Sequence, residues 1–353
     1  MYTKKKYSSR AMLKWTRREV RFFILIATVL TILYEVLGYH FLQIPWTAMA
    51  LIGTAVAFLI GFQSNAVYGR LWEARMIWGA IVNDSRTITL MFKEMINNEH
   101  AITKASENEL KKIQKRLVFR HIAWMTSLRH AMRSVKPWEA FRLNKRNQEL
   151  LDALHIPELE ISLEDDLQKH LTETELNEVL NKTNKAAAVM TLQVAELRQL
   201  KELGLIWEFS YLELNAKISD LIEHQGKSER IKNFPYPRQF ATLGYSFVNL
   251  FILLLPFGIV PEFHKLGQSL MVDFPIVGQY FVWLGIPFSA LVSWVFNTMQ
   301  RIGTVGENPF EGSANDVPIS TIARGIEIDI LEMIDTPKEE IPGPIPSDFD
   351  VQM

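Results

Sequence analysis

The stretch "GFQSNAVYGRLWEARMIWG", residues 61–79, decides the fold, because it begins as the end of an apolar segment and continues as a mixed aromatic and charged one. Gln63, Ser64 and Asn65 place three polar side chains near the end of the apolar part. Polar side chains in a membrane-spanning helix face protein or water, because lipid cannot satisfy their hydrogen bonds. Two interpretations stay open: a helix that borders a central water path, and a packed helix whose polar groups bond to neighbouring helices.

Long uncharged segments occur at four places in the chain of 353 residues. They are residues 46–69, 240–261, 274–300, and 22–42, the last of which contains Glu35 as its one charged residue. A helix needs about 20 apolar residues to cross the hydrocarbon core of a bilayer, where its own backbone bonds satisfy every peptide group. The sequence therefore predicts four transmembrane helices.

The distribution of basic residues predicts the orientation in the membrane. Residues 1–21 contain eight Lys or Arg against one acidic residue, whereas the links at 43–45 and 262–273 have only Lys265 on the positive side. By the positive-inside rule we expect a cytoplasmic N-terminus, and an even number of spans returns the C-terminus to the cytoplasm. The first apolar segment lacks a small-residue cleavage site and is too long for a signal peptide, so we expect it to remain as a span.

Six segments follow one another along the chain. They are a basic cytoplasmic N-terminus at 1–21, transmembrane helices 1 and 2 at 22–69, a cytoplasmic helical domain at 70–239, transmembrane helices 3 and 4 at 240–300, a cytoplasmic loop and helix at 301–335, and a proline-rich mobile tail at 336–353. The fold class is thus an all-α membrane protein whose cytoplasmic part is helical and continuous with the spans.

Within the cytoplasmic domain, apolar residues recur at helical spacing. In residues 107–133 the apolar side chains form one broad face of a helix, and the basic residues lie mostly on the opposite side. A second long amphipathic pattern, later in the chain, is interrupted by Gly204. Between these two patterns lies a polar and acidic excursion at about 140–185. We expect its acidic residues to form a solvated face; they are Glu158, Glu160, Glu164, Asp165 and Asp166.

Several classes of chemistry find no support in the sequence. The chain has no cysteine and a net charge of −1, which leaves no thiolate chemistry and no argument for nucleic-acid binding. None of the common phosphate-binding, zinc-protease or serine-hydrolase motifs occurs, and the eight histidines are scattered. We therefore expect no enzyme activity, no cofactor and no metal.

Four motifs carry a resemblance to a known family. "GFQSNAVYGRLWEARMIWGAIVNDSR" at 61–86 resembles the bestrophins, and specifically their bacterial relatives. Three further stretches agree in order: "GKSERIKNFPYPRQF" at 226–240, "ENPFEGSANDVP" at 307–318 and "IARGIEIDILEMI" at 322–334. The resemblance covers the chain from the first span to about residue 335, without the excursion at 140–185.

The resemblance implies a homopentameric ion channel of the bacterial inner membrane that passes small inorganic ions, chloride by analogy with the family. The second transmembrane helix of each subunit would line a hydrophobic neck, whose three rings fall on Thr54, Phe58 and Phe62. Thr54 stands where the family commonly has an aliphatic residue, so that ring is expected to be more easily wetted. A second, cytosolic constriction is expected near Phe209.

The resemblance also implies roles for residues outside the neck. The residues expected to fix the neck helix to the cytoplasmic vestibule are Arg70, Trp72, Glu73, Arg75 and Trp78, with a salt bridge between Arg70 and Glu73. In eukaryotic bestrophins a loop after the fourth span binds calcium. Here that loop, around Asn308, Ser313 and Asp316, lacks acidic residues where ligands are expected, so we expect no calcium gating.

Three alternatives remain open at this point. A cation-selective, sodium-conducting channel would have the same architecture, because an apolar neck has no fixed charge that excludes either sign. A membrane-anchored adaptor or sensor would use the amphipathic cytoplasmic helices to bind a partner protein. A transporter is a third class, although no inverted repeat is evident. Glu35 has three interpretations: a pore-entrance group, a group that reaches the outer membrane interface, or a partner of His40.

Overall fold

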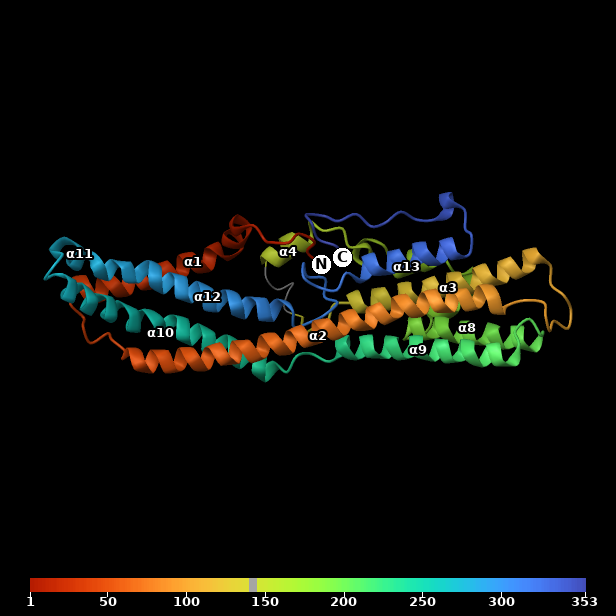
Figure 1. Cartoon of the computed structure of the whole chain (residues 1–353), viewed down its shortest axis with the longest axis horizontal. Helices are drawn as coiled ribbons and strands as arrows, with labels where there is room; N and C mark the ends of the chain where they lie inside the picture. Colours follow the sequence, from red (N-terminus) through yellow and green to blue (C-terminus); the bar gives the residue numbers. More distant parts are fainter. Residues whose placement is uncertain (140–144) are drawn as a thin grey trace. The chain divides into compact units, whose positions relative to one another are not determined.

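The computed structural model describes residues 1–139 and 145–353, and within these ranges it is all-helical with no strand. Figure 1 shows the helices along the chain. They are α1 Ser9–Thr31 with a π-helix at Ile32–Val36, α2 Trp46–Met95, α3 Glu107–Arg133, α4 Lys145–Leu151, α5 Pro157–Glu160, α6 Leu163–Leu167, α7 Glu173–Leu180, α8 Lys185–Glu202, α9 Glu208–Asn233, α10 Arg238–Leu270, α11 Pro275–Tyr280 with a 3₁₀ turn at Phe281–Leu284, α12 Gly285–Val305, and α13 Ile319–Met333 with a 3₁₀ turn at Lys338–Glu340.

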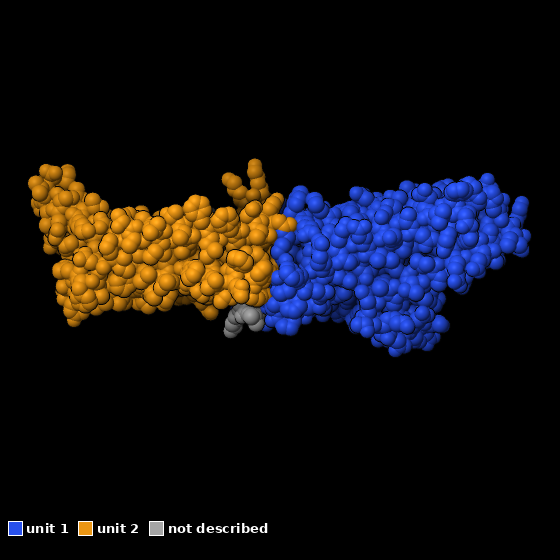
Figure 2. All heavy atoms as spheres, turned by 90° about the horizontal axis from the view of Figure 1, so that it is seen from below, with its two compact units in different colours: residues 1–3, 70–235, 308–353 blue, residues 4–69, 236–307 orange. Residues whose placement is uncertain are grey.

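The chain forms two compact units, which Figure 2 distinguishes by colour. Unit 1 contains residues 1–3, 70–235 and 308–353, and unit 2 contains residues 4–69 and 236–307. One boundary falls between Gly69 and Arg70, inside the uninterrupted helix α2. The charged segment that follows the apolar part of α2 therefore belongs to a different packing unit from the apolar part itself.

Unit 2 contains the apolar helices. Its helices α1, α10 and α12 pack against one another. Close contact with α2 requires glycine, because a Cβ at Gly53 would lie 3.0 Å from the ring of Phe251 and a Cβ at Gly258 would lie 2.8 Å from the side chain of Met49. Among the described residues, three helical segments are long and apolar enough to cross a membrane: Trp46–Met95, Arg238–Leu270 and Pro275–Val305.

The first expected span differs from the sequence prediction of residues 22–42. Its helix begins at Ser9, within the basic N-terminus, and ends at Val36 after the π-helix. The residues that follow are not helical, and Gly38 has a φ of +67°, a backbone conformation that favours glycine. The helical apolar part is therefore shorter than predicted, and Glu35 lies in the widened π-turn at its end.

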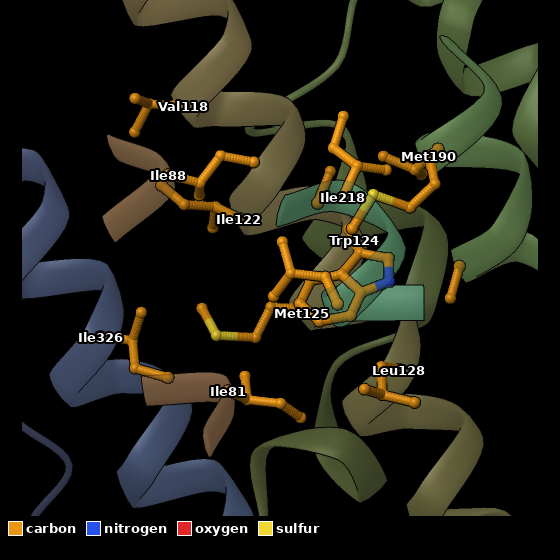
Figure 3. Close-up of a cluster of buried hydrophobic side chains, with 14 of the residues drawn as sticks. Ile81, Ile88, Val118, Ile122, Trp124, Met125, Leu128, Met190, Ile218 and Ile326 are labelled. Atoms are coloured by element: carbon orange, nitrogen blue, oxygen red, sulfur yellow. The ribbon is translucent and has the colours of Figure 1, made fainter. Parts of the chain in front are cut away.

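Unit 1 has one large hydrophobic core that surrounds α3. Figure 3 shows Trp124 and Met125 of α3 among side chains of other helices, including Ile81 of α2, Met190 of α8 and Ile326 of α13. The indole Nε1 of Trp124 donates a hydrogen bond of 2.9 Å to Gln225 of α9, which satisfies its one polar atom. Truncation of such a buried tryptophan costs about 3–5 kcal/mol of stability in typical proteins.

The basic side of residues 107–133, opposite the predicted apolar face, is not left to solvent. From Leu117 onward α3 is buried on nearly all sides, so that Arg120, Arg129 and Arg133 lie inside unit 1. The reason is that the excursion from residue 145 onward covers this face and supplies carboxylates. Arg129 Nη2, for example, lies 2.8 Å from Asp166 Oδ2.

The solvated acidic face predicted for the excursion is correspondingly wrong at two of its five positions, Glu158 and Asp166, which are buried. Burial opposes the ionisation of Glu158, yet the guanidinium groups of Arg129 and Arg133 and a hydrogen bond from Ser320 hold the pKa of this carboxyl below its usual value. The excursion is thus tied to α3 by paired charges, a pattern that hydropathy alone cannot reveal.

The end of the chain also differs from the expected mobile tail at 336–353. Val351 forms an isolated β-bridge with Tyr2, and Thr3 donates a backbone hydrogen bond of 2.8 Å to Asp350. Thr321 of α13 donates to the carbonyl of Met353 through both its backbone and its hydroxyl group. The prolines keep the tail extended, but its last residues are held by hydrogen bonds within unit 1.

Candidate functional site

Helix α2 presents two opposite faces within its first 24 residues. One face packs against its own chain; its buried residues are Met49, Gly53, Val56, Ile60, Gln63 and Val67. The other face carries Thr54, Phe58 and Phe62, all of which are exposed in the single chain. Phe58 is 65% exposed and Phe62 is 72% exposed. Exposed aromatic side chains in a line are a candidate surface for lipid, for a partner or for a shared pore.

Gln63, Ser64 and Asn65 do not all lie on the same face of α2. Gln63 is only 4% exposed, and its Nε2 donates a hydrogen bond of 3.1 Å to Oε1 of Glu307, just after α12. Asn65 is exposed on the side of Phe62. Ser64 is half-buried beside Gly303 of α12. The packed-helix interpretation therefore holds for Gln63, whereas Asn65 faces away from the subunit.

Arg70 and Glu73, two of the residues expected to fix the neck helix to the cytoplasmic vestibule, lie at the start of unit 1 and contact α9. The guanidinium Nη2 of Arg70 donates hydrogen bonds to the backbone carbonyls of Phe234, at 2.8 Å, and Ile231, at 3.3 Å. These bonds satisfy carbonyl groups at the carboxyl end of α9. Glu73 pairs with Arg230 near the same end. This arrangement replaces the simple Arg70–Glu73 pair of the sequence interpretation with contacts from each residue to α9.

The aromatic and basic residues that follow differ in exposure. Trp72 is 54% exposed, and Arg75 is exposed one turn further on. Trp78 is fully buried, with its ring centroid 6.3 Å from that of Phe310. Trp78 therefore belongs to the core of unit 1 and not to a membrane interface.

Phe209 lies in the first turn of α9 and is 63% exposed. Its ring packs against Trp207 at 4.7 Å between centroids. The structure places it on the surface of unit 1, as a constriction-forming residue would have to be in a single subunit. Only the sequence resemblance proposes that role.

The loop after α12 is organised by an internal carboxylate. Asp316 is buried, and its two oxygens accept backbone hydrogen bonds of 2.7–2.9 Å from Phe310, Gly312 and Val317. Arg133 Nη1 lies 3.4 Å from Asp316 Oδ2 and donates to the carbonyl of Phe310. These bonds support the positive φ of +73° at Phe310. Asn308 and Ser313 are buried in the same loop.

No cluster of three potential metal-ligating side chains occurs among residues 1–139 and 145–353. Glu35 accepts a hydrogen bond of 2.7 Å from His264 of α10. His40, the partner that one interpretation expected, instead lies beside His264, with the ring centroids 5.7 Å apart and the ring planes tilted by 40°. Sequence reasoning missed both the Glu35–His264 pair and the Gln63–Glu307 bond, because each joins residues more than 200 positions apart.

Comparison with known proteins identifies the family. A model of the bacterial and fungal bestrophin proteins matches residues 8–332. The chain belongs to the bestrophin family. The resemblance found in the four motifs is thereby confirmed over nearly the whole chain.

Named relatives of this bestrophin are bacterial. It is 25% identical over 330 residues to the voltage-dependent anion channel-forming protein YneE of Salmonella typhimurium, covering 93% of this chain and 88% of the relative. It is 26% identical over 320 residues to YneE of Escherichia coli, covering 91% and 85% of the two chains.

Solved structures share the fold. A crystal structure of a bacterial bestrophin homologue from Klebsiella pneumoniae aligns with a TM-score of 0.66 at 24% identity, over 90% of this chain and 98% of that one. A variant of a Klebsiella pneumoniae bestrophin homologue that carries one isoleucine-to-threonine substitution aligns with a TM-score of 0.70 at 22% identity, over 91% and 99%.

Proposed function

We propose that this bestrophin is a subunit of a homopentameric channel for small monovalent ions in the bacterial inner membrane, with both termini in the cytoplasm. Five copies of α2 would surround the pore, and Thr54, Phe58 and Phe62 would form its neck. The observation that carries this proposal is the aromatic face of α2, which stays exposed in the described part of unit 2 although the opposite face is well packed.

The proposed neck would work by wetting and dewetting. Rings of phenylalanine exclude water from a narrow passage, so a small rotation or dilation of the five helices changes whether ions can pass. Arg70, Glu73 and their contacts with α9 would hold the cytoplasmic continuation of α2, and Phe209 would contribute the second constriction. Arg75, Trp72 and Trp78 would support the same region.

Anion conduction is the selectivity that the named relatives favour, since they are described as anion channel-forming proteins. The exposed face of α2 from Thr54 to Phe62 carries no charge, so it excludes neither sign, and a sodium-selective channel is the second candidate. We expect no calcium gating, because Asp316 already accepts backbone bonds and faces Arg133. A calcium titration in lipid bilayers tests this expectation.

The deciding experiment records single-channel currents from purified protein in planar bilayers across a salt gradient. A reversal potential near that of chloride supports anion selectivity, and one near that of sodium supports the alternative. The double substitution Phe58→Ala and Phe62→Ala is expected to raise unitary conductance or leak severalfold, because it removes the two bulky rings of the neck.

The matched control replaces Phe240 and Phe247, two exposed phenylalanines of α10, by alanine. This control is expected to leave the conductance unchanged. Equal effects of the two double variants would contradict the neck assignment. Intact pentamers without unitary currents would favour an adaptor or sensor, and slow saturable flux would favour a transporter.

A further inference from the structure

Besides its apolar contacts, α2 makes one buried polar contact in unit 2, between Gln63 and Glu307. Gln63 follows Phe62 directly, so on a helix their side chains point about 100° apart. Phe62 points away from the subunit, while Gln63 points into it and reaches Glu307. Because both side chains belong to one helix, the rotational setting that places Gln63 against Glu307 also turns Phe62 outward.

Glu307 connects three helices at this point. Its side chain is 1% exposed, and it accepts the bond from Gln63 on one oxygen. Its other oxygen lies 3.6 Å from Nη1 of Arg238, in the first turn of α10. A buried carboxylate needs such partners, because an unpaired charge in the interior is costly. Gln63, Glu307 and Arg238 thus form one polar junction, which we call the α2 junction.

The orientation of the Gln63 amide follows from this contact. A carboxylate only accepts hydrogen bonds, so the amide nitrogen must face Glu307 and the amide oxygen must face the other way. That oxygen is buried without a hydrogen-bond partner among the described residues. It points toward Gly244 of α10, where a Cβ would lie only 2.9 Å from it.

A second amide approaches the same place. Gln300 of α12 is 4% exposed, and within residues 1–139 and 145–353 neither its nitrogen nor its oxygen has a hydrogen-bond partner. Its Nε2 lies 3.8 Å from the position that a Cβ of Gly244 would occupy. The space left by this glycine is therefore bordered by an acceptor from Gln63 and a donor from Gln300.

Buried polar atoms without partners are costly, so a modest movement that pairs them is favourable. We infer that Gln63 is the positioning residue of the neck helix: its amide nitrogen holds α2 against Glu307 in one rotational setting, and in a second setting its amide oxygen gains a hydrogen bond from Gln300. This inference rests on the proposed neck function.

The test uses full-length protein in planar bilayers and separates unitary conductance from open probability. Gln63→Leu removes the amide, and with it the hydrogen bond to Glu307, but leaves Phe58 and Phe62 in place. It is expected to raise the open probability severalfold while the unitary conductance stays close to the original, since the bond no longer holds the narrow setting. Gly244→Ala is expected to act in the same direction, because its Cβ displaces the amide.

A rescue variant distinguishes positioning from general damage. Gln63→Glu combined with Glu307→Gln restores one amide and one carboxylate at the junction, and is expected to return the open probability toward that of the original protein. Glu307→Gln alone is expected to shift it, and Asn249→Leu, at an exposed polar position on α10, is the matched control without effect. An unchanged open probability in Gln63→Leu overturns the inference, and so does a change in conductance equal to that of Phe62→Ala.

Failure of the proposed function itself would look different. If the original protein carries no current, thermal melting of Gln63→Glu, Glu307→Gln and their double variant still reports whether the two residues are coupled. A double variant whose melting temperature recovers relative to both single variants supports the junction without a channel. Additive losses in melting temperature contradict it.

Discussion

Phe62 and Gln63 show how adjacent side chains of one helix can serve different surroundings. Phe62 is 72% exposed and Gln63 is 4% exposed. The polar residue is the buried one, which reverses the usual hydrophobic-inside rule at a single step of the chain. The sequence alone indicated that Gln63 avoids lipid. It could not indicate its partner, because Glu307 lies 244 positions away.

The burial of a titratable side chain was equally hard to predict from the sequence. His121 of α3 is buried in unit 1, where its Nε2 lies 2.8 Å from the hydroxyl oxygen of Ser85. Burial lowers the pKa of His121 from 6.5 to about 4. The helical spacing of α3 could not reveal this, because the covering helices come from distant parts of the chain.

The pKa of His121 leads to a prediction about acid stability. Between pH 6.5 and about 4 the unfolded chain binds a proton at this residue that the folded chain does not bind, so stability falls as the pH falls through this range. At pH 5 the loss is about 2 kcal/mol for this one group. His121→Gln is expected to reduce the difference in denaturation midpoint between about pH 7.5 and pH 5. His100→Gln, at an exposed site, is the control. If both variants show the same difference in denaturation midpoint between the two pH values, the acid sensitivity does not come from His121.

At the scale of elements, hydropathy predicted the long helices well and their ends less well. α2 begins at Trp46, the residue where the predicted second span begins, and continues to Met95 as expected for a span joined to the cytoplasmic domain. The first span is shorter than predicted, because local backbone geometry at Gly38 and the π-turn carries no hydropathy signal. The excursion was misjudged because its acidic residues pair with arginines of α3.

Gly204 is the element boundary that the sequence did identify. It lies between α8 and α9 at a φ of +76°, and a Cβ there would lie 2.2 Å from the carbonyl oxygen of His100. Gly204→Ala is expected to lower the stability of unit 1 by at least about 2 kcal/mol through backbone strain and this clash. The measurement is the denaturation midpoint of the purified protein.

Gly226 supplies a matched control for this substitution. It lies inside α9, and no atom of the described residues would lie within 4 Å of a Cβ at this position. Gly226→Ala is expected to stabilise the protein by about 0.5–1 kcal/mol, since alanine favours helix. If both substitutions destabilise the protein equally, the explanation based on the turn at Gly204 is wrong.

At the scale of the whole molecule, a single chain leaves much apolar surface uncovered. Exposed large hydrophobic residues are found on α1, α2, α10 and α12 of unit 2. Lipid can cover three of these helices, whereas the proposed pentamer assigns the aromatic face of α2 to the shared axis. Neither hydropathy nor a single subunit distinguishes these two surroundings, so the assembly has to be tested directly.

The absence of cysteine from the sequence makes such a test clean. Phe62→Cys introduces one thiol per subunit, and five thiols around a narrow axis are expected to form covalent dimers with an oxidant or a short bismaleimide. Leu250→Cys, on an exposed position of α10, is expected to form no covalent dimers under the same conditions. Light scattering should report five copies of the 40.8-kDa chain. Cross-linking of both variants to the same extent would reject the axial position of α2.

The spacing of buried residues along α2 has a consequence for its tolerance to changes in length. Met49, Gly53, Val56, Ile60, Gln63 and Val67 alternate in steps of four and three, and Ala74, Ile77 and Ile81 continue the same seven-residue rhythm. A repeat of about 3.5 residues per turn predicts a gentle left-handed winding of α2 around its neighbours. One inserted residue would rotate the following part of α2 by about 100° and expose its buried face. An insertion of seven residues would instead lengthen α2 by about 10 Å and keep its buried residues on one face.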